Sequence, residues 1–152
     1  MKKILLFGIS ILLIFSCSST NTSAPLENKD VRAASFKSLE NTSWKLTDIS
    51  GEKIITKNIN GKETGIITLD IAGDRISGSG GVNKYFGSYT VDDGIIKMSN
   101  VGSTKMMGPE DLMKVEEKYF SILQNVTSFE ILDSGILVLN SDAGSLTFKR
   151  VN

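Results

Sequence analysis

From about Leu39 onward, the chain alternates short apolar segments with turns, and this alternation limits the fold more than any other feature. In residues 66–71, for example, Ile67, Leu69 and Ile71 recur at every second position, which is the period of a strand with one buried face. The turns are short and rich in Asp and Gly, as in Asp92-Asp93-Gly94. Because short hairpins join antiparallel neighbours, the sequence predicts an antiparallel sheet.

The first predicted strand shows the alternation clearly. Trp44, Leu46 and Asp48 share one face, Ile49 lies on the other, and Ser50-Gly51-Glu52 ends the strand. The predicted strands cover residues 43–49, 66–71, 75–80, 85–91, 95–99, 128–132, 136–140 and 145–151.

One segment follows a helical period instead. It opens at Pro109-Glu110-Asp111 and runs to about Asn125, with an apolar face that includes Leu112, Tyr119 and Ile122. Proline and acidic residues in the first turn are typical of a helix start. The predicted fold class is therefore α+β: a small antiparallel β-sheet or partly open barrel of seven to eight strands packed against one amphipathic helix.

The N-terminus has the layout of a bacterial lipoprotein signal peptide. Lys2-Lys3 precede an apolar run over residues 4–15, which is too short for a transmembrane helix of roughly 20 residues. The only cysteine, Cys17, follows directly, and Ile14-Phe15-Ser16-Cys17 resembles a lipobox. We expect a signal peptide over residues 1–16, cleavage before Cys17, and lipids on Cys17 that hold the protein to a membrane. The alternative is an ordinary signal peptide with an unrelated cysteine.

The rest of the mature chain divides into two parts. Residues 17–38 are rich in Ser, Thr and Asn and are predicted to be a lipidated flexible tether, whereas residues 39–152 are predicted to be the folded domain. Loss of Lys2 and Lys3 with the signal peptide leaves 15 basic and 17 acidic groups, a net charge of −2. This balance argues against a nucleic-acid partner, whose binding depends on Lys and Arg.

Two absences limit the chemistry. The sequence contains no histidine, so Ser-His-Asp and Cys-His nucleophile pairs are excluded. A single cysteine allows neither an internal disulfide nor a Cys-rich zinc site. We predict no catalytic residue, no metal site and no cofactor.

The densest glycine cluster spans residues 78–84 and invites comparison with a phosphate-binding loop. The comparison fails because Asn83 and Tyr85 occupy positions that such a loop gives to Gly and to Ser or Thr, and because a strand follows. We expect these glycines to serve close backbone packing or positive φ angles.

Four side chains of this region could form an aromatic binding surface, with ordinary sheet packing as the alternative: Asn83, Tyr85, Phe86 and Tyr89. The methionines at 98, 106, 107 and 113 could bind a soft metal, but we expect them to fill the core. We interpret Asp92-Asp93 as turn residues and Glu116-Glu117-Lys118 as a solvated helix face.

Taken in order, several stretches resemble one family. They are residues 41–46 as an opening strand, the run Gly81-Val82-Asn83-Lys84-Tyr85-Phe86-Gly87 within residues 76–89, and residues 103–107 ahead of the helix. Together they are similar to the META domain of HslJ-like bacterial lipoproteins, over roughly residues 38–151. The resemblance implies a small β-rich domain with a helix, no established enzymatic activity, and a link to envelope or heat-stress responses. That family commonly has cysteine at the positions of Val82 and near Gly108, and neither cysteine is present here.

The leading hypothesis is a lipid-anchored, non-enzymatic cell-envelope protein that binds an envelope protein or an apolar ligand. We expect it at the outer membrane facing the periplasm, because Ser18 stands where an Asp retains some lipoproteins at the inner membrane. Two alternatives stay open: a small enzyme that uses carboxylates or tyrosines, and a pilot-like assembly factor for an outer-membrane protein.

Overall fold

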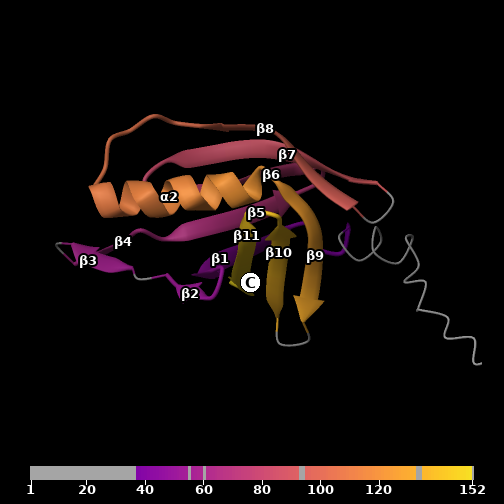
Figure 1. The fold of residues 1–152 in the computed structure, drawn as a ribbon, viewed down its shortest axis with the longest axis horizontal. Helices are drawn as coiled ribbons and strands as arrows, with labels where there is room; N and C mark the ends of the chain where they lie inside the picture. The colour runs from indigo at the N-terminus through magenta and orange to yellow at the C-terminus, as the bar shows by residue number, and fades with distance from the viewer. Residues whose placement is uncertain (1–36, 55, 60, 93–94, 133–134, 152) are drawn as a thin grey trace, which may run out of the picture.

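The alternating segments pair into one antiparallel sheet in the computed structural model, which describes residues 37–54, 56–59, 61–92, 95–132 and 135–151 (Figure 1). The predicted signal peptide, Cys17 and the tether up to residue 36 lie outside the described residues. Among the described residues, no helix combines the length and the apolar character that crossing a membrane requires.

Eight strands lie side by side in the order β8-β7-β6-β5-β1-β11-β10-β9, each antiparallel to its neighbours. The short strand β2 (Glu52–Lys53) pairs with β1, and β3 (Lys57–Ile59) pairs with β4 (Lys62–Thr64) in a separate ribbon. The eight strands are β1 (Thr42–Ile49), β5 (Ile67–Ala72), β6 (Arg75–Gly80), β7 (Lys84–Asp92), β8 (Ile95–Ser103), β9 (Val126–Leu132), β10 (Ile136–Ser141) and β11 (Gly144–Arg150).

The sheet curls into a nearly closed barrel, because β8 and β9, the two ends of this path, also contact each other. The helix α2 (Glu110–Leu123) packs against β6, β10 and β11. Figure 1 shows α2 running alongside β6 and β7, with β9 to β11 at one end of the helix. The α+β class with one helix and an antiparallel, barrel-like sheet is confirmed.

The core is filled by side chains from both the sheet and the helix. Large side chains that are at most 1 % exposed come from β1, β5, β6, β8, β10, β11 and α2. Burial of each such side chain contributes about 1.5–3 kcal/mol to stability. The barrel interior is thus a packed core of the kind that small barrels form. Its most deeply buried members are Leu69, Ile96, Tyr119, Leu123, Leu137, Leu139, Leu146 and Phe148.

The first strand departs from the predicted alternation at one point. Its pairing with β11 shifts between Leu46 and Asp48, so Thr47 is the extra residue of a β-bulge. A one-residue shift exchanges the two faces of a strand, so Ile49 is buried and Asp48 is not. The predicted placement of Asp48 on the face of Trp44 and Leu46 is therefore wrong.

Strand lengths also differ from the prediction in two places. β8 continues to Ser103 instead of ending at Ser99, through an irregularity opposite Gly87 where Asn100 has a φ of 53°. The short strands β2, β3 and β4 were not predicted from the sequence. Their segments are rich in Lys, Asn and Glu, so they lack the apolar alternation that marks the other strands.

Candidate functional site

The turn between β6 and β7 contains the central signature, and it is tightly closed. The Gly80 N–H donates to the Asn83 carbonyl at 2.7 Å, and Gly81 has a φ of 110°, a conformation that favours glycine. A side chain at Gly80 would meet the Glu116 carboxylate at 2.6 Å. The turn therefore sits directly against the helix.

Glu116 of α2 binds this turn with both carboxylate oxygens. Its Oε1 accepts hydrogen bonds from the Asn83 N–H at 2.6 Å and the Val82 N–H at 3.2 Å, and its Oε2 accepts from Asn83 Nδ2 at 2.6 Å. The side chain is only 4 % exposed, so the predicted solvated helix face is wrong at Glu116, although Glu117 and Lys118 are exposed. Three donors offset the cost of removing the carboxylate from water.

Asn83 extends this contact to the chain segment that precedes the helix. Its Oδ1 accepts from the Met106 N–H at 2.7 Å and from the Thr104 hydroxyl at 2.9 Å. The amide therefore faces the carboxylate with its NH₂ group and the loop with its oxygen, which uses both ends of the side chain. We call the set Asn83, Glu116, Thr104 and the Met106 backbone the Asn83 bridge. It joins the turn before β7, the helix α2 and the loop at Thr104 and Met106 in one hydrogen-bonded network, whose Asn83–Glu116 part is buried.

A second buried contact joins the signature to the helix. The Tyr85 hydroxyl donates to the Thr68 carbonyl at 2.8 Å and lies 2.7 Å from the Tyr119 hydroxyl, which therefore donates to Tyr85. Burial raises the pKa of both Tyr85 and Tyr119 above the ordinary value, so both phenols stay protonated at neutral pH. This pair acts as a hydrogen-bonded element of the core.

The same close approach explains the glycine cluster. A side chain at Gly78 would collide with the Thr68 carbonyl and come within 3.0 Å of the Tyr85 ring. Close backbone packing, as predicted from the sequence, is confirmed at Gly78 and Gly80. Tyr89 is buried as well, and its hydroxyl donates to the Gly73 carbonyl at 2.6 Å.

The four residues of the predicted aromatic surface do not share one surface. Asn83, Tyr85 and Tyr89 are at most 8 % exposed, whereas Phe86 is 67 % exposed. The cause is strand alternation in β7, which turns Tyr85 and Tyr89 inward and Phe86 outward. Phe86 is the member of this set that faces solvent.

The methionines fall into two groups. Met98 and Met113 are half-buried, and Met98 packs against the core. Met106 and Met107 are 52 % and 96 % exposed, so the predicted core-filling role is wrong for these two. They lie in the loop whose backbone is held by the Asn83 bridge. A signal was present in the sequence: both precede the Gly108-Pro109 break, outside the helical repeat.

The described surface has several shallow grooves. A groove of about 280 Å³ between β2 and α2 has apolar walls that include Ile54, Leu112 and Val115. Another of about 300 Å³ is lined by Asp74, Arg75 and Phe86 among others. No group of three or more His, Cys, Asp or Glu side chains that could hold a metal ion occurs among the residues that the structure describes.

Comparisons with known proteins agree with this geometry. The family model for the META domain matches residues 37–152. The NMR structure of a protein from Burkholderia xenovorans has a similar fold, with a TM-score of 0.61 and 24% identity over 82% of this chain and 89% of that one. A second NMR structure has a TM-score of 0.58 and 17% identity, covering 74% of this chain and 92% of the other. A search of curated proteins found no match.

Proposed function

Because the chain belongs to the META domain family, we propose that it is a lipid-anchored, non-enzymatic protein of the cell envelope that binds a partner protein through its outer surface. The META domain is not a known enzyme family. The lipobox at Cys17 would supply the lipid anchor, and the loop that contains Met106 and Met107 would form the binding surface.

The main observation behind the proposal is that the loop is exposed while the side chains that hold its backbone are buried. Met107 is almost fully exposed, while Asn83 and Glu116 below it are 4 % exposed and fully hydrogen-bonded. A methionine pair held outward on a fixed backbone presents a polarizable, adaptable apolar contact, of the kind that protein-binding surfaces use. The buried network would hold this loop in place before a partner arrives, which reduces the entropy lost on binding.

The packed interior of the barrel favours a binding site on the outer surface over one inside the barrel. Its described buried side chains are at most 8 % exposed, and the described grooves are open, with volumes of about 200–380 Å³. The apolar-ligand hypothesis would therefore need the outer grooves. A protein partner requires only the exposed loop.

The anchor would keep the domain within reach of the bilayer. The residues between Cys17 and Lys37 can span at most roughly 65 Å when extended. Several acyl chains on Cys17 would give stable attachment. With Ser18 after the cysteine, we propose the outer membrane, facing the periplasm, as the location.

Two experiments test the two halves of the proposal. For the anchor, Cys17→Ser should abolish the acyl mass increment; retention of the increment would refute lipidation of Cys17. For the binding surface, affinity capture from crosslinked envelopes should recover a partner with the native chain. The partner should be lost with Met106→Ser/Met107→Ser and kept with the exposed control Lys53→Ser. Capture that is unchanged by the methionine substitutions would refute the loop as the binding surface.

A further inference from the structure

The outer face of β6, β7 and β8 has an unusual composition, which strand register defines. Arg75 lies opposite Ser88, Ser79 opposite Lys84, and Thr90 opposite Lys97, so these side chains point to the same side of the sheet. That side is outward, because the alternate residues Ile76, Tyr85 and Ile96 are buried. We call it the β6–β8 face; its main members are Arg75, Ser77, Ser79, Lys84, Phe86, Ser88, Thr90, Asp92, Ile95, Lys97 and Ser99.

The charge on the β6–β8 face is mainly positive. Arg75, Lys84 and Lys97 are exposed. The one carboxylate on these strands, Asp92, lies at the turn end of β7, and Asp74 in the turn before β6 lines the same groove as Arg75 and Phe86. The chain as a whole has no such excess, since 17 basic groups balance 17 acidic ones. The outward side chains of the neighbouring strands β5 and β1 carry mixed charge, for example Asp70 of β5 and Lys45 of β1.

Two large apolar side chains stand among these cations. Phe86 is 67 % exposed and Ile95 is 46 % exposed. The Phe86 ring lies across Gly102 of β8, where an added side chain would meet it at 3.3 Å. The ring therefore lies along the sheet and presents one side to the solvent.

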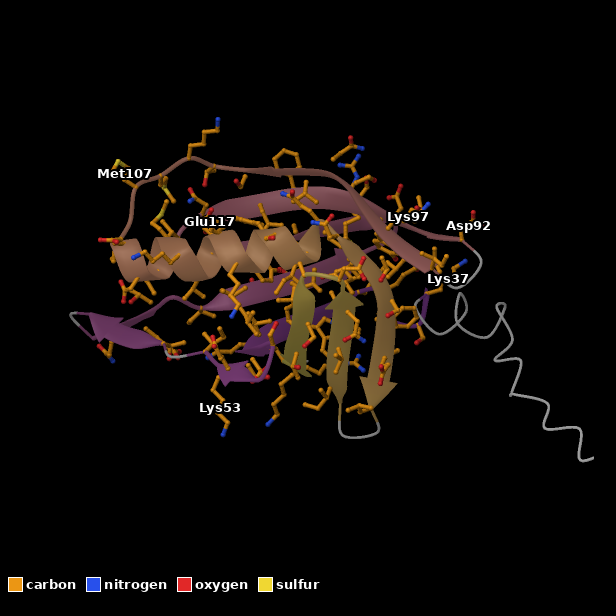
Figure 2. All side chains as sticks on the ribbon, viewed as in Figure 1. Lys37, Lys53, Asp92, Lys97, Met107 and Glu117 are labelled. Carbon is orange, nitrogen blue, oxygen red and sulfur yellow. The ribbon has the colours of Figure 1, made fainter. Side chains whose placement is uncertain are left out.

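The described chain begins near the end of β7 that leads into β8, beside the inward-facing side chains of that strand. Lys37 lines a shallow pocket of about 200 Å³ together with Tyr89 and Val91 of β7. Figure 2 shows Lys37 near the same end of the molecule as Asp92 and Lys97.

From these observations we infer that the β6–β8 face binds the surface of an anionic phospholipid bilayer. Its cations match the negative charge of such a surface, and each adds to the attraction at short range. Phe86 and Ile95 can enter the boundary between headgroups and acyl chains, which a purely ionic partner would not require. This contact goes beyond the proposed function, because it needs neither acylation of Cys17 nor the Met106–Met107 loop.

The test is cosedimentation with vesicles, using the unlipidated chain from residue 18, which includes the whole described domain. Phosphatidylethanolamine vesicles are compared with vesicles that also contain phosphatidylglycerol. We expect binding to the second kind only. Lys84→Glu/Lys97→Glu should weaken it by more than about tenfold, because each cation contributes a factor of roughly five, and Phe86→Ser should weaken it without lowering the thermal unfolding temperature.

The matched control is Lys53→Glu/Lys149→Glu, which changes the net charge equally at exposed sites on other strands. It should bind like the native chain. An equal loss of binding in this control would show an effect of net charge and would refute the β6–β8 face as the membrane-binding surface. Absence of binding to anionic vesicles would refute it as well. If the chain bound soluble polyphosphate as strongly as it binds anionic vesicles, and Phe86→Ser did not weaken that binding, the partner would instead be an acidic polymer. Since the probe lacks the anchor, none of these outcomes depends on Cys17.

Discussion

Val82 packs directly against the backbone of Gly108, so that a β-carbon added at Gly108 would lie 3.4 Å from the Val82 Cβ and 2.7 Å from its Cγ1. Val82 belongs to the turn that Glu116 binds, and Gly108 lies just before the helix that carries Glu116. The resembled family commonly has cysteine at the position of Val82 and again near Gly108. The Val82 side chain here occupies the space beside Gly108 that a side chain at position 108 would need.

This contact predicts an engineered disulfide. A Cβ–Cβ separation near 3.4 Å is close to the range of disulfides. In a chain without Cys17, Val82→Cys/Gly108→Cys should therefore oxidise to a crosslinked form. Closing this loop should raise the free energy of unfolding by about 3 kcal/mol. Thiol titration and thermal unfolding with and without reductant measure both effects.

The control for the disulfide is Gly108→Ala with Val82 retained. The added methyl group would press on Val82 and should lower stability by about 1–3 kcal/mol. Free thiols in the oxidised double variant would show that the two positions are not adjacent in the way described.

A second prediction concerns the buried carboxylate. The Glu116 carboxylate accepts hydrogen bonds from N–H groups on both of its oxygens. Glu116→Gln replaces one of these oxygens with an NH₂ group, which cannot accept, so at least one N–H group loses its partner. The free energy of unfolding should fall by about 2–3 kcal/mol in chemical denaturation. The neighbouring Glu117→Gln, on the exposed side of the same helix, should change it by less than about 0.5 kcal/mol. If the two substitutions lowered the free energy of unfolding equally, the Asn83 bridge would not be a source of stability.

The tyrosine pair predicts an order of effects. Tyr119→Phe removes only the hydrogen bond that Tyr119 donates, so it should cost about 1 kcal/mol. Tyr85→Phe leaves both the Tyr119 hydroxyl and the Thr68 carbonyl without this partner, so it should cost more, about 2 kcal/mol. Denaturation of both variants checks the order, and a reversed order would mean that the hydroxyl of Tyr119, not that of Tyr85, is the central one.

The same pair predicts how stability depends on pH. Burial raises the pKa of Tyr85 and Tyr119 in the folded state above the unfolded value of about 10. A raised pKa of an acid means that the unfolded state loses its proton first, so stability is fully present below about pH 10 and is lost as the pH rises further. Tyr119→Phe should reduce this alkaline loss relative to the native chain. An identical pH dependence in the two proteins would contradict the burial of an ionisable phenol.

Much of the fold could be predicted because its signals are local. Alternation marks β5 and β6 without knowledge of their partners, and the Pro109 start and apolar stripe mark α2. The bulge at Thr47 could not be predicted, since it arises from the pairing of β1 with β11. The candidate site was harder for the same reason. Glu116 finds its partners on a turn that is 33 or 34 residues distant in sequence, so its spacing on the helix alone gave no reason to expect a buried carboxylate.

In the proposed function, the Asn83 bridge holds Met106 and Met107 outward for a partner protein. Its most direct test is photo-crosslinking in living cells, with a benzophenone amino acid placed at position 107 and, as control, at the exposed position 53. We expect one discrete crosslinked product from position 107, none from position 53, and a strong decrease at position 107 when Asn83→Ala removes the bridge in a chain that remains folded. No product from position 107, or the same products from both positions, would contradict it.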